Sequence, residues 1–179
     1  MKKLTFLILT ILFFISCQPN ETEQTVTIEN KYSISIPSFL SKASNLNDAA
    51  SFQYQHVWKE FYVIAIDENK EKLKEAIVEN HLTESYSNNL QGYTNLLLDN
   101  FRRVITISSE SQVIDTLINN MPAKIVSISG KVEGIDAFYS LAFIEGKNRY
   151  YQIMSWTLLS RESEYREKMS KLIFSFKEI

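Results

Sequence analysis

The sequence predicts an α+β domain in which helices pack on the faces of a twisted antiparallel sheet. Its 179 residues are 45% hydrophobic and 22% charged, which is the composition of a single globular domain. Apolar residues alternate in the N-terminal part, follow a helical period in the middle and alternate again further on. The links between the later strands are too short for parallel crossovers, so these strands are expected to form an antiparallel meander.

Three strands are expected before residue 67. They cover residues 26–36, 51–58 and 61–66. The first is a strand or a hairpin, with Tyr32, Ile34 and Ile36 on one face, and it ends at Pro37 because proline has no N–H to donate. A loop, Ser38 to Asp48, follows it. The shared face of the second strand consists of Phe52, Tyr54, His56 and Trp58.

Two helices are expected in the middle of the chain. The first covers residues 69–81 and has Asp67 and Glu68 near its start, where the helix dipole favours acidic groups. One face of this helix is formed by Leu73, Ala76, Ile77 and Asn80. The second covers residues 82–101, with Gly92 expected to kink or divide it. Its stripe at helical spacing is Leu82, Tyr86, Leu90, Tyr93, Leu97 and Phe101.

The remaining chain is expected to be a meander followed by a helix. The strands cover residues 103–108, 112–118, 123–132, 137–145 and 149–158, separated by turns at 119–122, 133–136 and 146–148. Ser160 is expected to cap the final helix, with Glu162 and Glu164 in its first turn. Its buried stripe is expected to be Tyr165, Met169, Leu172, Ile173 and Phe176.

The first 16 residues have the features of a lipoprotein signal peptide. Lys2 and Lys3 form a basic start, and Leu4 to Ile15 is apolar but reaches only about 18 Å, too short for a bilayer core of about 30 Å. The run ends in Phe14-Ile15-Ser16-Cys17, which resembles a lipobox with Phe in place of the commoner Leu. Cys17 is the only cysteine and the expected lipidation site, carrying palmitate and related acyl chains. The alternatives are an uncleaved anchor or a secretory signal with an incidental cysteine.

The lipid, rather than charge, is expected to hold the protein to the membrane. Cleavage removes both early lysines and leaves 17 basic against 21 acidic residues, a net charge of about −4 that anionic headgroups do not attract. Gln18 follows the cysteine where an Asp would mark inner-membrane retention, so the outer membrane is expected. Residues 17–25 are expected to form a tether, and residues 26–179 the single domain.

No cofactor, metal or catalytic residue is predicted. A single cysteine excludes a disulfide framework and cysteine-based metal centres, and the charge excludes a basic nucleic-acid interface. The sequence has no Gly-x-Ser-x-Gly elbow and no glycine-rich phosphate loop. His56 is expected to pack within its strand. His81 and Glu84 lack a third metal ligand, so a role at a helix end is expected.

Two groups of residues leave a binding role open. Aromatic residues on two neighbouring strands either fill the core or line a groove for a partner; they are Tyr139, Phe143, Tyr150, Tyr151 and Trp156. Arg102 and Arg103 with Arg149 are either a small cationic patch or solvated surface. The acid pairs Asp67/Glu68 and Glu162/Glu164 are expected to be charges at helix starts rather than a glycosidase pair.

Four stretches together resemble the PsbP-like family, over roughly residues 28–179. They are Tyr32-Ser-Ile-Ser-Ile-Pro37, Ile118-Asn-Asn-Met-Pro-Ala123, Tyr150-Tyr-Gln-Ile-Met-Ser-Trp156-Thr and Leu172-Ile-Phe-Ser-Phe-Lys177. The family includes the extrinsic PsbP subunit of photosystem II, and the Ran-binding nuclear import factors share its fold. The resemblance implies a three-layer αβα sandwich with a central antiparallel sheet. It implies no catalytic residue, since members act as binding or assembly subunits.

The expected function is that of a membrane-anchored envelope lipoprotein that acts as a protein-binding or assembly module without catalytic activity. The alternative is a periplasmic carrier of a small or lipid-like ligand, which would need a sizeable apolar cavity. The expected partner is an unknown envelope protein, held through loops at the sheet ends. These loops are Ser38 to Asp48, Asn119 to Pro122, Glu133 to Asp136 and Gly146 to Asn148.

Overall fold

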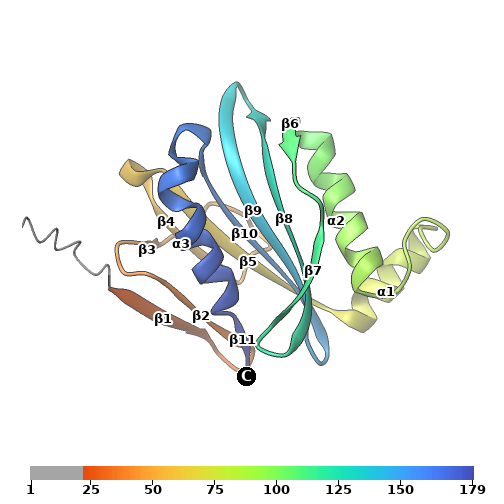
Figure 1. Ribbon diagram of the computed structural model, residues 1–179. Coiled ribbons are helices and arrows are strands. Elements are labelled where there is room, and N and C mark those ends of the chain that lie inside the picture. Colours follow the sequence, from red (N-terminus) through yellow and green to blue (C-terminus); the bar gives the residue numbers. More distant parts are fainter. Residues whose placement is uncertain (1–21) are drawn as a thin grey trace, which may run out of the picture.

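A computed structural model describes residues 22–179, in which helices cover both faces of a large antiparallel sheet (Figure 1). The strands of the large sheet are β3 (Ser41–Lys42), β4 (Phe52–His56), β5 (Phe61–Asn69), β6 (Thr106–Glu110), β7 (Ile114–Ile118), β8 (Met121–Val132), β9 (Ile135–Glu145) and β10 (Arg149–Leu158). A small sheet contains β1 (Glu23–Ile28), β2 (Tyr32–Pro37) and β11 (Lys177–Glu178). The helices are α1 (Lys70–Glu79), α2 (Leu90–Val104), α3 (Glu162–Phe174) and the 3₁₀ turns η1 (Val57–Lys59) and η2 (Leu159–Arg161).

The large sheet has the order β3-β4-β5-β10-β9-β8-β6, and every pairing in it is antiparallel. The long strand β8 is paired on its outer side by β7 along its first half and by β6 along its second half. The predicted meander is therefore confirmed. Its turns use backbone conformations that asparagine tolerates, since Asn119 and Asn120 both have positive φ, at 48° and 67°.

One face of the large sheet packs against α3 and the small sheet. The predicted stripe of α3 is buried there, and so are Tyr32, Ile34 and Ile36 of β2. The first strand region is thus a hairpin, β1–β2, with its apolar face turned inward as expected. The ring of Phe176, just after α3, lies 5.2 Å from the ring of Tyr32 and 4.8 Å from that of Tyr151. This aromatic contact fastens the end of the chain to both sheets.

The opposite face packs against α2. Leu90, Tyr93 and Leu98 of the helix join Leu141 and Phe143 of β9 in a second core. Helices on both faces of an antiparallel sheet form the predicted three-layer αβα sandwich, with the small sheet as an addition beside α3 (Figure 1). No helix within residues 22–179 is long and apolar enough to cross a membrane.

The second predicted helix was placed too early in the chain. Residues 80–89 form turns, and α2 begins after Asn89, whose side-chain oxygen accepts a hydrogen bond from the Gly92 N–H at 2.9 Å. Gly92 therefore lies in the first turn and does not divide the helix. A Cβ at this position would lie 1.8 Å from the Ser87 carbonyl oxygen, so the close approach of the preceding turn requires glycine. The helix then continues through Val104, and the next strand begins at Thr106 instead of Arg103.

Three further boundaries differ from the prediction. Ser160 lies within η2 and is not the cap of α3, which follows Arg161 without a capping side chain. Trp58 does not share the face of β4, because the chain leaves the strand at His56 and enters η1. The strand β1 begins at Glu23, so the last three residues of the expected tether belong to a strand. The expected signal peptide and Cys17 lie outside the described residues.

Candidate binding site

Both histidines are used in local backbone structure. The Nδ1 atom of His56 accepts a hydrogen bond from the Lys59 N–H at 3.1 Å and closes the turn of η1. His81 follows the last residue of α1 with a positive φ of 55°, and the Leu82 N–H returns to the Ile77 carbonyl at 2.9 Å. The prediction of a role at a helix end is therefore confirmed for His81. Among residues 22–179, no three acidic, histidine or cysteine side chains are close enough to hold a metal ion.

Asp67 was expected to be a charge at a helix start, but this prediction is wrong. Its carboxylate forms a buried pair of salt bridges instead. Its side chain is 3% exposed and lies 2.6 Å from the Arg149 guanidinium and 2.9 Å from the Lys31 ammonium. Asp67 ends up here because β5 continues to Asn69, and the asparagine side chain caps α1 instead. The carboxylate joins β5, β10 and the β1–β2 turn, so this is a structural link between the two sheets. By contrast, Glu162 and Glu164 do lie in the first turn of α3.

Of the two alternatives for Arg102, Arg103 and Arg149, the cationic patch does not form. Arg149 is engaged with Asp67, as described above. Arg102 lies 3.0 Å from the Asp99 carboxylate and 2.5 Å from that of Glu110. Two of the three guanidinium groups are thus neutralised by separate acidic partners on different parts of the fold.

The predicted aromatic cluster belongs mainly to the two cores. Tyr150 and Tyr151 point to opposite faces of the sheet, as expected, and both are buried. Tyr150 stacks on Tyr93 of α2, with ring centroids 4.7 Å apart. Trp156 is only half-buried and stacks on Tyr62 at 5.3 Å. Core packing therefore accounts for these side chains, and the large rings leave the interior filled.

Burial raises the pKa of several tyrosines. Burial together with the neighbouring Glu60 carboxylate raises the pKa of Tyr62 to about 12. Burial also raises the pKa of Tyr32, Tyr139 and Tyr151, and the Glu178 carboxylate adds to the effect at Tyr151. Each of these phenols is therefore held neutral by the folded structure over a wider pH range than in the unfolded chain.

We expect the protein to lose stability under alkaline conditions because of these tyrosines. A folded-state pKa above the unfolded value of about 10 stabilises the fold fully below pH 10, and this stabilisation is lost as the pH rises through the folded-state value. For Tyr62 that window runs from about 10 to about 12. Phenolate absorbance and circular dichroism should be followed together from pH 8 to pH 12. Titration of all the tyrosines at their ordinary pKa, with the fold intact, would contradict the prediction.

An open groove lies between α3 and the β7–β8 edge of the large sheet. Its volume is about 240 Å³. Its apolar part consists of Ile114 from β7, Ile125 from β8, and Ile173 and Phe174 from α3. Its polar part includes Ser127 and Ser140, which are direct partners in the β8–β9 register, and Arg166 of α3. The Arg166 guanidinium is fixed at this end, since it lies 4.5 Å from the Phe138 ring and pairs with Glu162.

The strand β7 leaves apolar side chains exposed on both of its faces, and one of them, Ile114, lines this groove. Within residues 22–179, β7 pairs with β8 alone, so its other edge has no partner strand. Ile114 is 54% exposed and Leu117 is 61% exposed, on opposite faces of the strand. Natural edge strands are usually protected by charge, proline or a covering element. An unpaired edge with exposed apolar residues beside a groove is suited to receive an extended segment of another protein.

Sequence reasoning predicted the β7 strand but not the groove. The four loops expected to make contacts are also not one surface. Asn119 donates to the Phe176 carbonyl at 2.6 Å, and the Lys147 N–H donates to the Glu178 carboxylate at 2.9 Å, so these two loops lie at the C-terminal end. The β8–β9 turn, which contains Glu133, lies at the opposite end of the sheet (Figure 1).

Comparison with solved structures identifies the fold. No family profile and no curated protein sequence matches this chain. The solution structure of cyanobacterial PsbP (CyanoP) from Synechocystis sp. PCC 6803 aligns with a TM-score of 0.55 and 8% identity, covering 89% of this chain and 94% of that one. LpqN, involved in cell envelope biogenesis of Mycobacterium tuberculosis, aligns with a TM-score of 0.53 and 8% identity, covering 88% and 90%. The resemblance seen in the sequence is confirmed at the level of architecture: this chain has a PsbP-like fold.

Proposed function

We propose that this protein is a lipid-anchored module of the bacterial cell envelope that binds or helps to assemble another protein and has no catalytic activity. Cys17 carries the lipid and holds the domain at the outer membrane. The observation that carries the proposal is the unpaired, apolar edge of β7 beside the α3 groove. Confinement at a membrane raises the effective concentration of this edge near other envelope proteins.

The contacts of the polar side chains support a role in binding rather than catalysis. His56 closes a turn and His81 ends a helix. The buried carboxylate of Asp67 is matched by two cations, which leaves it no free position as a general base. The similar fold of LpqN, described as involved in cell envelope biogenesis, agrees with an envelope location.

The alternative, a carrier of a small or lipid-like ligand, has less support. The groove has apolar walls, but its volume of about 240 Å³ is below the range of about 300–1,000 Å³ usual for ligand pockets. The space between the sheet and α3 is occupied by large buried rings, among them Tyr32, Phe138 and Tyr165. A groove that is shallow and open suits a peptide side chain better than an enclosed lipid tail.

The binding mode that fits this geometry is the addition of a strand. An extended segment of the partner lies along β7, where main-chain hydrogen bonds supply affinity. Alternate side chains of that segment reach the groove between Ile114 and Phe174, while the others pass over Leu117. The serines that line the groove and Arg166, which already pairs with Glu162, then contact polar groups of that segment.

Chemical crosslinking in intact cells, followed by mass spectrometry, tests the proposal with two matched variants. Ile114→Lys places a charge in the groove, and Ile135→Lys changes an isoleucine that is equally exposed, 55% against 54%, at the distant β8–β9 turn. We expect an envelope protein to crosslink to the wild type and to Ile135→Lys, and to be lost from Ile114→Lys because its apolar contact is removed.

Two results would count against this function. Equal crosslinking of both variants would show that the groove is not the binding surface. The absence of any crosslinked protein, together with a lipid that copurifies with the wild type, would favour the carrier.

A further inference from the structure

Trp58 is the most exposed large hydrophobic side chain within residues 22–179. It is 89% exposed, and its neighbour Val57 is 54% exposed. Both lie in η1, the turn between β4 and β5, which contains no buried residue. Isolated apolar residues on a surface are common, but an almost fully exposed tryptophan next to an exposed valine makes no contribution to the core.

The conformation of η1 is fixed, so the exposure of Trp58 is not a result of a loose loop. The His56 ring accepts from the Lys59 N–H at 3.1 Å at one side of the turn. At the other side, Glu60 adopts a left-handed conformation, with φ of 51°, and its N–H returns to the Val57 carbonyl at 3.0 Å. A left-handed non-glycine residue costs free energy, and here it serves to turn the chain sharply around Trp58.

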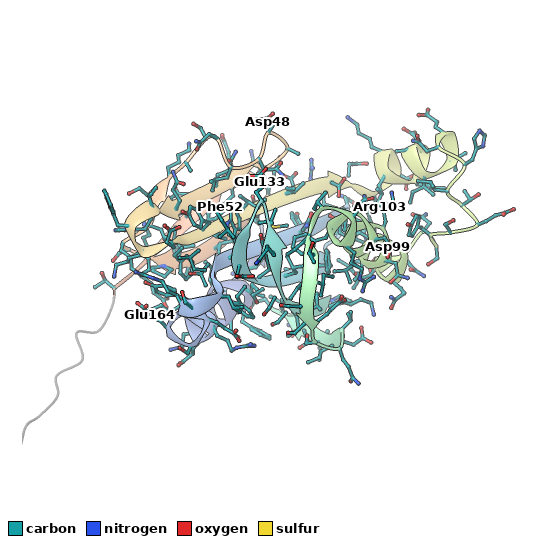
Figure 2. The ribbon with its side chains drawn as sticks, turned by 90° about the horizontal axis from the view of Figure 1, so that it is seen from above. Asp48, Phe52, Asp99, Arg103, Glu133 and Glu164 are labelled. Atoms are coloured by element: carbon teal, nitrogen blue, oxygen red, sulfur yellow. The ribbon has the colours of Figure 1, made fainter. Side chains whose placement is uncertain are left out.

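The turn lies on the same side of the molecule as the point where the chain enters the fold, and the segment Ser38–Phe39 contacts both. The Thr22 carbonyl accepts a hydrogen bond from the Ser38 N–H at 2.9 Å, so Thr22 lies beside the residue that precedes Phe39. The Lys59 ammonium lies 4.9 Å from the centre of the Phe39 ring, and the His56 ring contacts its edge. In both views, the β4–β5 turn and the start of β1 are on the left side of the molecule (Figures 1 and 2).

We propose that Val57 and Trp58 insert into the interfacial layer of the bilayer next to the lipid on Cys17. The inference rests on the lipid anchor of the proposed function. Thr22 is five positions after Cys17, and five residue steps at full extension span only about 18 Å. The end of the domain that contains Thr22, Phe39 and η1 is therefore held close to the headgroups, while α1 and α2 lie at the other end (Figure 1).

The chemistry of η1 matches a membrane interface. Tryptophan is enriched at the headgroup level, because its ring is amphipathic. Lys59 carries a long stem that lets its ammonium reach the phosphates while the turn approaches the acyl chains. The nearest acid, Glu60, accepts a hydrogen bond from the Tyr62 hydroxyl at 2.7 Å and is thus engaged with the sheet. A lipid on Cys17 and the η1 turn together give two points of attachment, which set one orientation of the domain.

Tryptophan quenching by brominated lipid tests this contact. The chain has two tryptophans, so Trp156→Phe leaves Trp58 as the sole emitter and Trp58→Phe leaves Trp156. Each full-length variant is expressed, processed by the cell, purified from its membranes and reconstituted into vesicles of phosphatidylcholine, with or without bromine on the upper acyl chain. We expect Trp58 to lose most of its emission in brominated vesicles and Trp156, which stacks on Tyr62, to keep its emission.

The same preparations separate failure of this contact from failure of the anchor. Circular dichroism confirms that both variants are folded, and intact mass reports whether Cys17 carries acyl chains. If the protein is acylated but bromine does not change the emission of Trp58, the proposed membrane contact is wrong while the anchor stands. The exposed η1 turn would then be available to bind another protein. Unmodified Cys17 would overturn the anchor and, with it, the inference.

Discussion

Replacing Cys17 by Ser is expected to move the protein from the membrane fraction to the soluble fraction. Several acyl chains on one residue give anchoring far beyond the marginal binding of a single chain, at about 0.8 kcal/mol for each buried CH₂ group. Charge cannot replace the lipid, because the mature net charge is about −4. Labelling with radioactive palmitate followed by fractionation measures both the modification and the location. Gln18→Ser, at the next position, is the matched control and should behave as the wild type.

The same experiment distinguishes the alternatives for the N-terminus. A Cys17→Ser protein that stays in the membrane with its first 16 residues intact would indicate an uncleaved anchor. Wild-type protein that is released and unlabelled would indicate an ordinary secretory signal. Either result would contradict lipidation at Cys17, and both are visible in the mass of the purified N-terminal peptide.

Phe176→Ala is expected to cost about 3–5 kcal/mol of unfolding free energy, because it removes a fully buried ring and leaves a cavity. This ring contacts Tyr32 of the small sheet and Tyr151 of the large sheet, so its loss weakens the joint between them. The matched control is Phe174→Ala, two residues earlier, whose ring is 41% exposed. We expect this control to cost on the order of 1 kcal/mol.

Urea unfolding followed by circular dichroism measures both variants. Midpoints that shift by the same amount would show that Phe176 does not join the two sheets. We expect Phe176→Ala to unfold in a single cooperative transition, at a lower urea concentration than the wild type.

The sequence was sufficient to predict what depends on local periodicity. The buried stripe of α3 and the inward face of β2 follow from spacings of three to four and of two residues, and both lie in the core. The β7–β8 turn was predictable because Asn119-Asn120 suits a two-residue turn with positive φ. The resemblance to the PsbP-like family extended this local information to the correct layer architecture.

Features that depend on contacts between distant residues were not predictable. The cations that pair with Asp67 are 36 and 82 residues away in sequence, so its burial had no local signal. Trp58 continues the alternation of β4 in sequence, but the strand ends at His56 and the chain enters the turn η1 before it reaches Trp58. The start of α2 depended on the Ser87 carbonyl lying against Gly92. Each of these is decided by tertiary packing rather than by propensity.

The candidate site was missed for a related reason. The residues Ile114 to Ile118 read as an ordinary strand, and nothing in them indicates that β6 takes the other half of the same side of β8. That division leaves β7 as a short edge beside α3, which comes from the far end of the chain. The available signal was the presence of Ile114 and Leu117 on opposite faces of one strand, which is unusual for a strand with a solvent-exposed edge.

The most direct test of the central claim is photo-crosslinking from the groove in living cells. A photoreactive amino acid replaces Ile114 in the full-length chain, and a second strain carries it in place of the equally exposed Ile135. We predict that position 114 captures a defined envelope protein and that position 135 does not. Capture of no protein from position 114, or of the same set of proteins from both positions, would contradict a binding function for this edge.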